Sequence, residues 1–259
     1  MPLYYEQHGS TNNPTLIFLH GFLGNHLDWH HTIEQLKDQF HCVAIDLPGH
    51  GNSVTTDLSI EKGFTHCHQL IRFCVNELGV SSFALVGYSL GGRIALDYAR
   101  SQQDPRLTHL ILESSHIGLQ DERDKMQRYH SDLIWAESFA TQPIEENLYE
   151  WYDQPIFDDL SDTEKKGVIE HRMDNYGVYL ANTLLATSLS QQTCALPFIQ
   201  ETALPISYFY GQNDNKFTQI ANALPIKKNI NIHPFTGLGH NIHIQQPIIY
   251  AEQIKQQLL

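Results

Sequence analysis

One pentapeptide restricts the folds open to this chain more than any other feature, namely Gly-Tyr-Ser-Leu-Gly at positions 87–91. It follows the apolar run 83–86 and opens an amphipathic stretch over 90–100, which predicts a strand, a sharp turn and a helix in that order. Glycines are needed beside the serine because side chains there would collide with the adjoining strand and helix. The setting predicts that Ser89 is catalytic. The alternative is a Gly-rich turn in which Ser89 only caps a helix.

A catalytic serine requires a histidine and an acid, because its hydroxyl is a poor nucleophile or base until an imidazole removes its proton. Asp214 follows the apolar strand 206–210, and His240 lies in the glycine-rich loop 237–241. The chain order Ser, Asp, His is that of the α/β-hydrolase fold rather than of the trypsin or subtilisin folds. The alternatives are that Asp214 only forms a turn and that His240 is one of 16 histidines that happens to lie in a loop.

An oxyanion that develops during such a reaction needs preorganised donors. The N–H of Leu90 follows the serine at the start of a helix, where backbone donors lack partners. The N–H of Phe22 follows His20-Gly21 at the end of the strand 16–19. We expect both amides to form the oxyanion hole. His20 could be a second base, but a structural histidine that braces this loop is the interpretation we favour.

Length and patterning predict one α/β domain with an insertion, since 259 residues with 41% hydrophobic content leave little room for a second core. Short apolar strands alternate with amphipathic helices, which indicates a mostly parallel, doubly wound sheet. Strands are expected at residues 3–8, 16–19, 42–46, 83–86, 107–112, 206–210 and 230–233. Helices are expected at residues 30–40, 60–78, 90–100, 215–224 and 247–258.

Composition argues against several classes of protein. No apolar run reaches the roughly 18–20 residues of a membrane span, and the N-terminus lacks the features of a signal peptide, so a soluble cytoplasmic protein is expected. The net charge of −13 disfavours nucleic acid and anionic membranes as partners. The four cysteines lack zinc-type spacing and are expected to be free and buried: Cys42, Cys67, Cys74 and Cys194. A metal site at 66–68 is disfavoured because a helix would splay adjacent side chains.

The segment 116–195 interrupts the alternation of strands and helices with helical, aromatic-rich sequence, and it is expected to form an inserted helical lid. It contains Arg128, Trp151 and Arg172; for both arginines the alternative is a solvated surface charge. Arg93 lies four residues after Ser89, so both share one helical face and the guanidinium should overhang the serine. The alternative for Arg93 is a surface pair with Asp97.

Four segments together resemble one family: Gly-Tyr-Ser-Leu-Gly-Gly-Arg at 87–93, Ser-His-Ile-Gly-Leu-Gln at 115–120, Trp-Tyr-Asp-Gln-Pro-Ile-Phe at 151–157 and Gly-His-Asn at 239–241. The chain is similar, through nearly its whole length, to the 2-succinyl-6-hydroxy-2,4-cyclohexadiene-1-carboxylate synthases of menaquinone biosynthesis, which have the α/β-hydrolase fold. The stretch 225–234 is slightly longer than is usual in that family, and it should affect only a surface connection.

The resemblance implies that Ser89, Asp214 and His240 form a triad. It further implies carboxylate-binding arginines and pocket-lining aromatic residues: Arg93, Arg128, Arg172, Tyr88 and Trp151. The family substrate, 2-succinyl-5-enolpyruvyl-6-hydroxy-3-cyclohexene-1-carboxylate, carries three carboxylates and loses pyruvate. No metal or organic cofactor is implied, and the partner is a small polycarboxylate. Two alternatives stay open: a carboxylesterase, thioesterase or C–C bond hydrolase with a nucleophilic serine, and a non-catalytic small-molecule receptor.

Overall fold

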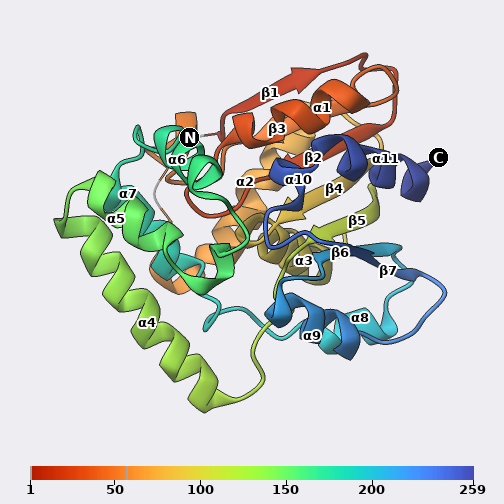
Figure 1. The fold of residues 1–259 in the computed structure, drawn as a ribbon. Helices are drawn as coiled ribbons and strands as arrows, with labels where there is room; N and C mark the ends of the chain where they lie inside the picture. Colours follow the sequence, from red (N-terminus) through yellow and green to blue (C-terminus); the bar gives the residue numbers. More distant parts are fainter. Residues whose placement is uncertain (1, 57) are drawn as a thin grey trace.

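A seven-stranded sheet forms the centre of the molecule (Figure 1). The computed structural model describes residues 2–56 and 58–259. The strand order is β1-β3-β2-β4-β5-β6-β7; β1 is antiparallel to β3, and the other neighbours are parallel. The strands are β1 (Tyr5–His8), β2 (Thr15–Leu19), β3 (His41–Ile45), β4 (Phe83–Tyr88), β5 (Leu107–Glu113), β6 (Ile206–Gly211) and β7 (Ile230–Phe235). All seven predicted strands are confirmed to within two residues at either end.

Helices cover both faces of the sheet, which explains why every residue of β2 is buried. Leu16 and Phe18 point to one hydrophobic cluster, while Ile17 points to another on the opposite face, as the two-residue period of a strand requires. The first face is covered by α1 (His30–Leu36) and α11 (Pro247–Leu258). The second is covered by α2 (Gly63–Glu77), α3 (Leu90–Gln102), α8 (Leu196–Glu201) and α9 (Asn215–Ala223). Each fully buried Leu or Phe stabilises the fold by about 1.5–3 kcal/mol.

Helix ends differ from the predicted ones where short turns intervene. The first helix ends at Leu36 rather than at Phe40, because residues 37–39 turn back toward β3. Residues 60–62 form a separate 3₁₀ turn, η3, before α2 begins. The helix predicted at 247–258 is confirmed as α11, and a short α10 (Ile242–Gln245), which we did not predict, precedes it.

The segment between β5 and β6 forms the helical lid, residues 116–195 (Figure 1). Its helices are α4 (Glu122–Thr141), α5 (Ile144–Tyr152), η4 (Pro155–Phe157), α6 (Asp162–Glu170) and α7 (Gly177–Ala186). A third hydrophobic cluster joins Phe139, Leu148 and Leu180 of the lid to Leu23 of the loop after β2. The lid therefore packs against the loop at the carboxyl end of β2 through a small core of its own.

The outer strand β7 contains Pro234 within its span. The amide of Ile206 donates to the carbonyl of Asn229, and the amide of Gln212 donates to the carbonyl of Phe235. The backbone groups of odd-numbered residues in 229–235 therefore face β6. Pro234 consequently lies on the outward side, where its missing N–H breaks no bond of the sheet. Residues 225–229 form the connection from α9, and Ile226 is fully exposed there, as expected for a surface segment.

The cysteines are free, and three of them are buried. Burial raises the pKa of the Cys67 thiol to about 12, so that group is an inert part of the core. Cys194 is only half-buried, which differs from our expectation, because it lies where the lid rejoins the sheet. Of the helices in residues 2–56 and 58–259, none combines the length and the apolar character needed to cross a membrane.

Candidate active site

The turn between β4 and α3 holds Ser89 in a strained conformation, with φ 48° and ψ −106°. Such backbone strain costs about 1–3 kcal/mol and persists only where the surroundings impose it. Gly87 makes the turn possible, since a Cβ there would lie 2.6 Å from the carbonyl oxygen of Gly91. A Cβ on Gly91 would in turn collide with the carbonyl of Leu19 in β2. The two glycines thus let the helix pack tightly beneath the half-buried Ser89.

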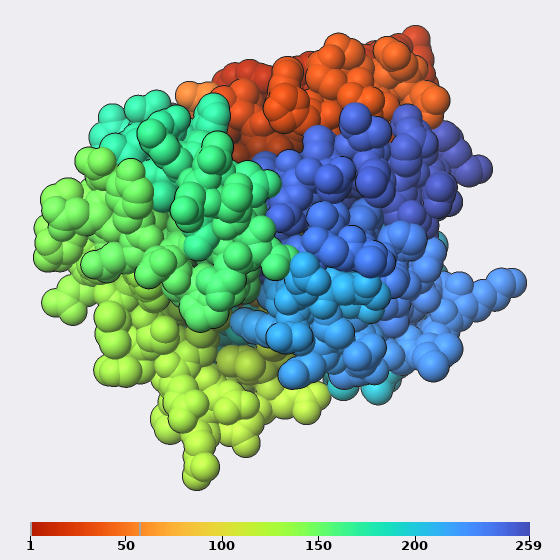
Figure 2. Space-filling view, viewed as in Figure 1, coloured from red at the N-terminus to blue at the C-terminus, as the bar shows by residue number. Residues whose placement is uncertain are grey.

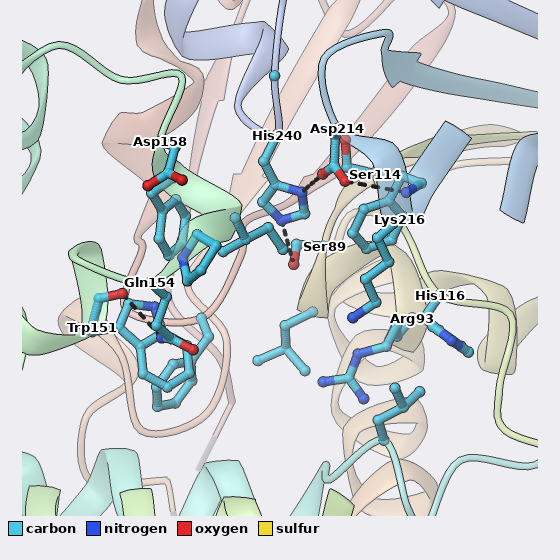
Figure 3. Close-up of a pocket in the computed structure, with 18 of the residues that line it drawn as sticks. Ser89, Arg93, Ser114, His116, Trp151, Gln154, Asp158, Asp214, Lys216 and His240 are labelled. Atoms are coloured by element: carbon cyan, nitrogen blue, oxygen red, sulfur yellow. Dashed lines mark hydrogen bonds and ion pairs between the residues drawn. The ribbon is translucent and has the colours of Figure 1, made fainter. Parts of the chain in front are cut away.

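His240 lies between Ser89 and Asp214 (Figure 3). Its Nδ1 lies 2.9 Å from Oδ2 of Asp214, and its Nε2 lies 3.3 Å from Oγ of Ser89. A carboxylate only accepts, so Nδ1 carries the proton and Nε2 is free to accept the hydroxyl proton. Both Asp214 and His240 are buried. The three predicted residues therefore meet in the geometry of a proton-transfer triad.

The backbone amides of Phe22 and Leu90 are the expected donors of the oxyanion hole. Phe22 and Leu90 both line the cavity described below. Within the described part of the chain, neither amide donates a hydrogen bond to another protein group. His20 is fully buried, donates from Nδ1 to the carbonyl of Gly21 at 2.7 Å and accepts at Nε2 from the amide of Leu47. It therefore braces the loop that carries Phe22, as we expected.

A second buried acid–histidine pair lies just after His240, and sequence reasoning missed it. Glu113, at the end of β5, accepts hydrogen bonds from the backbone N–H and from Nδ1 of His243, at 3.1 and 2.9 Å. The ring of Tyr88 packs between His240 and His243, with centroid distances of 5.2 and 4.7 Å. This cluster fixes the start of α10 and thereby the loop that positions His240.

A cavity of about 660 Å³ opens above Ser89 between the lid and the carboxyl ends of the strands. Figure 2 shows the green lid and the blue segments after β6 meeting on this face of the molecule. The cavity is lined by Phe22, Leu90, Arg93, Arg128, Trp151, Lys216 and His240, among others. Trp151 packs on Phe22 with a centroid distance of 5.0 Å, so one wall is aromatic. In Figure 3, Arg93 and Lys216 lie on the opposite side of the serine from Trp151.

Arg93 points into the cavity rather than to the surface. Its guanidinium donates to the carbonyl of Thr187 at 2.8 Å. Burial and the nearby Arg128 lower the pKa of Arg93 to about 9, which still leaves it cationic at pH 7. Asp97, the alternative partner, instead pairs with Arg100 at 2.6 Å. The surface-pair alternative is therefore wrong.

Arg128 lines the cavity, with its Nε 2.8 Å from Asp132. Arg172 does not line it. Its guanidinium is buried and donates to Asp28 at 2.8 Å and to the hydroxyl of Tyr152 at 3.0 Å. The three arginines therefore do not converge above Ser89. The structure also corrects the expectation that Tyr88 lines the pocket, because its ring is buried beneath His240.

Two cavity residues escaped the sequence analysis as functional groups, Lys216 and His116. His116 accepts the amide N–H of Gly118 at Nδ1, so Nε2 carries its proton. Burial, with Lys216 and Arg93 nearby, lowers the pKa of His116 to about 3 and keeps it neutral. The signal that could have revealed Lys216 is its place two residues after Asp214, in the first turn of α9.

Comparison with known proteins places these features in a family. A family model described as alpha/beta hydrolase fold matches residues 14–246. The 2-succinyl-6-hydroxy-2,4-cyclohexadiene-1-carboxylate synthase of Serratia proteamaculans is 36% identical, over 98% of this chain and 96% of that relative. The synthase of Enterobacter sp. is 38% identical, over 96% and 93%. The chain belongs to this synthase family.

Solved structures agree with the fold, and one of them supports the synthase family. MenH from S. aureus superposes with a TM-score of 0.87 and 28% identity, covering 98% of this chain and 97% of that one. A carboxylesterase of Nitrososphaera gargenis superposes with a TM-score of 0.79 at 20% identity, over 99% and 93%. The second match shows only that esterases share the fold. The predicted α/β-hydrolase fold with its inserted lid is confirmed.

Proposed function

We propose that this member of the synthase family is a lyase. Its substrate would be 2-succinyl-5-enolpyruvyl-6-hydroxy-3-cyclohexene-1-carboxylate, from which it eliminates pyruvate to give the cyclohexadiene carboxylate named in its relatives. One observation carries the proposal: the contact between Ser89 and His240 opens into a cavity that also holds cationic groups. Within the described residues, Arg93 has no carboxylate partner, so it is available to an anionic substrate. That pairing fits a substrate with several carboxylates.

The proposed reaction begins with proton removal from the ring carbon next to the succinyl ketone. His240 accepts the hydroxyl proton of Ser89, and the serine oxygen then takes the ring proton. The electron pair forms a C=C bond between that ring carbon and the ketone carbon, and negative charge gathers on the ketone oxygen, where the N–H groups of Phe22 and Leu90 would stabilise it. As the charge returns through the conjugated system, the C–O bond to the enolpyruvyl group breaks. The departing enolate takes up the proton held by His240 and becomes pyruvate, which returns the triad to its starting state.

Substrate binding would use charge on one side of the cavity and an aromatic surface on the other. A charge-assisted hydrogen bond contributes about 1.5–3 kcal/mol, more than a neutral one. Arg93 can present a planar fork to one carboxylate, and Trp151 offers a flat surface to the ring. Arg128 would contribute only part of its charge, because Asp132 already binds its Nε.

Pyruvate release from freshly prepared substrate tests this proposal. Wild-type protein should produce pyruvate, followed by coupled lactate dehydrogenase, well above the rate in buffer. Ser89→Ala should reduce the catalysed rate by at least about 10³-fold, since loss of a triad member removes the base. Its circular dichroism and melting temperature should match those of the wild type. A wild-type rate no higher than that in buffer would refute the lyase assignment.

The hydrolase alternative predicts a different result with activated esters. A nucleophilic serine would form an acyl-enzyme at Ser89, which intact-protein mass spectrometry detects as an added mass. We expect the lyase to show slow or no turnover of p-nitrophenyl esters while it releases pyruvate rapidly. Fast ester hydrolysis without pyruvate release would favour the hydrolase. Ligand binding without turnover of either substrate would favour the receptor.

A further inference from the structure

Lys216 lies in the first turn of α9, two residues after the catalytic Asp214. Its side chain lines the cavity and remains accessible to solvent there. Figure 3 shows Lys216 and Arg93 directed toward the same part of the pocket, beside Ser89. Its Nζ lies 5.4 Å from the ring centroid of Phe217, a contact that leaves all three ammonium donors available.

Lys216 has no carboxylate or hydrogen-bond partner in the described residues, unlike Arg128, whose Nε is bound to Asp132. The charged and titratable groups around it come from each neighbouring element: Arg93 of α3, His116 after β5, Arg128 and Asp132 of α4, and Asp214 before α9. Partial desolvation by the cavity walls and the two arginines lower the pKa of Lys216 to about 8, although its side chain keeps access to solvent. The group is therefore charged at pH 7, yet none of the described carboxylates lies close enough to form an ion pair with it.

The family resemblance implied that Arg172 is the third carboxylate-binding cation, but the structure gives that residue another role. Arg172 is buried outside the cavity, where Asp28 balances its charge. The cations that line the described cavity are Arg93, Arg128 and Lys216. With Lys216 counted in place of Arg172, three cations line the cavity. That number matches the three carboxylates of the expected substrate.

We propose that Lys216 binds one carboxylate of the polyanionic substrate, so that it, and not Arg172, completes the cationic set of the cavity. This inference rests on the proposed function and makes it more specific. An ammonium ion acts as a compact point charge with rotatable donors, whereas Arg93 offers a fixed fork. The two cations should therefore hold two different carboxylates on the side of the cavity opposite Trp151.

Kinetics of Lys216→Met test the inference. We expect KM to rise about ten-fold or more, with kcat changing by less than about three-fold, because the lost contact binds ground state and transition state alike. Lys216→Arg should restore most of the affinity. Lys255→Met provides the matched control, because it is the same substitution at a lysine of α11 that does not line the cavity. An unchanged KM in Lys216→Met would overturn the inference.

The pH dependence of KM separates binding from a structural effect. In the wild type, KM should rise as the pH passes about 8, because Lys216 loses its charge there. The rise should move to higher pH in Lys216→Arg, and it should be absent near pH 8 in Lys216→Met. A rise near pH 8 that persists in Lys216→Met would contradict the inference, because another group would then be responsible.

Binding of tricarballylate, a simple tricarboxylate, tests Lys216 without turnover. Isothermal titration calorimetry at pH 7 should show a Kd about ten-fold or more higher in Lys216→Met than in the wild type and in Lys255→Met. A wild type that releases no pyruvate would refute the lyase, whereas active protein with equal tricarballylate affinity in all three forms would refute only the role of Lys216.

Discussion

Asp214 performs two separate tasks with its two carboxylate oxygens. Oδ2 lies 2.9 Å from Nδ1 of His240, whereas Oδ1 accepts the amide N–H of Phe217 and so caps the start of α9. The first task sets the tautomer of the His240 imidazole, and the second satisfies a backbone donor that the helix leaves free. The two tasks can be separated by substitution.

Asp214→Asn should abolish most activity and leave the fold intact. The amide oxygen can still cap α9, but an amide can present N–H to His240, which favours the wrong tautomer. We expect kcat to fall by about 10³–10⁴-fold, as for other triads of this type. The melting temperature should stay within a few degrees of the wild type. Asp214→Ala, which also removes the cap, provides the comparison and should cost about 1 kcal/mol more in stability.

At the residue scale, the sequence predicted the triad because a serine, an acid and a histidine each follow a predicted strand. Their order along the chain is that of the α/β-hydrolase fold. The sequence could not predict the fate of Arg172, since the partner Asp28 lies 144 positions away in the chain. It did not single out Lys216, because a position two residues after Asp214 does not by itself show that the side chain reaches the cavity under the lid. Such roles depend on contacts between distant segments, which periodicity and spacing do not encode.

Among the elements, the lid and the loop after β2 are joined by a buried ion pair. Arg172, which follows α6, binds Asp28 of the 3₁₀ turn η1 (His26–Trp29), and Asn175 donates to the carbonyl of Leu23. Burial alone would raise the pKa of Asp28, but the charge of Arg172 lowers it below its ordinary value. The pair therefore holds the lid against the loop that carries the Phe22 amide.

Arg172→Met should destabilise the protein because it leaves the Asp28 carboxylate buried without a partner. Breaking such a pair costs about 3–5 kcal/mol, which urea titration at pH 7 would detect. The double variant Asp28→Asn with Arg172→Met should recover part of this loss, since the uncompensated charge is gone. Unchanged stability together with a raised KM would instead show that Arg172 reaches the substrate.

Element boundaries were predicted well where strands are buried on both faces, since continuous apolar runs such as β2 leave few alternatives. The predictions were weaker where short turns replace helix ends, as after Leu36, because local hydrogen bonds decide those ends. The internal helices of the lid were not resolved from the sequence. Their packing depends on a cluster that includes Leu23, a residue far outside the segment.

For the molecule as a whole, one buried and two half-buried histidines with lowered pKa values contribute to the response to acid. Burial lowers the pKa of His50 and His116 to about 3 and that of His109 to about 4. In the unfolded chain the same groups titrate near 6.5. Between these values the unfolded chain binds more protons than the folded one, so stability is full above about pH 6.5 and declines as the pH falls toward 4.

Thermal unfolding between pH 7.5 and 4 should show this decline in melting temperature. His109→Gln should make the decline shallower, because glutamine does not titrate and can keep a hydrogen bond to Ser207. The exposed His30, changed to Gln, serves as the control and should leave the curve unchanged. Equal slopes in all three proteins would show that His109 does not contribute to acid sensitivity.

Pro234 has a consequence for the behaviour of the protein at high concentration. Sheets with open edges recruit strands from neighbouring molecules and can grow into aggregates. On the outer side of β7, this ring nitrogen offers no hydrogen to an incoming strand, which interrupts the row of donors that such growth requires. Pro234, which the pairing of β7 with β6 tolerates, thus hinders the addition of a strand from a second molecule at this edge.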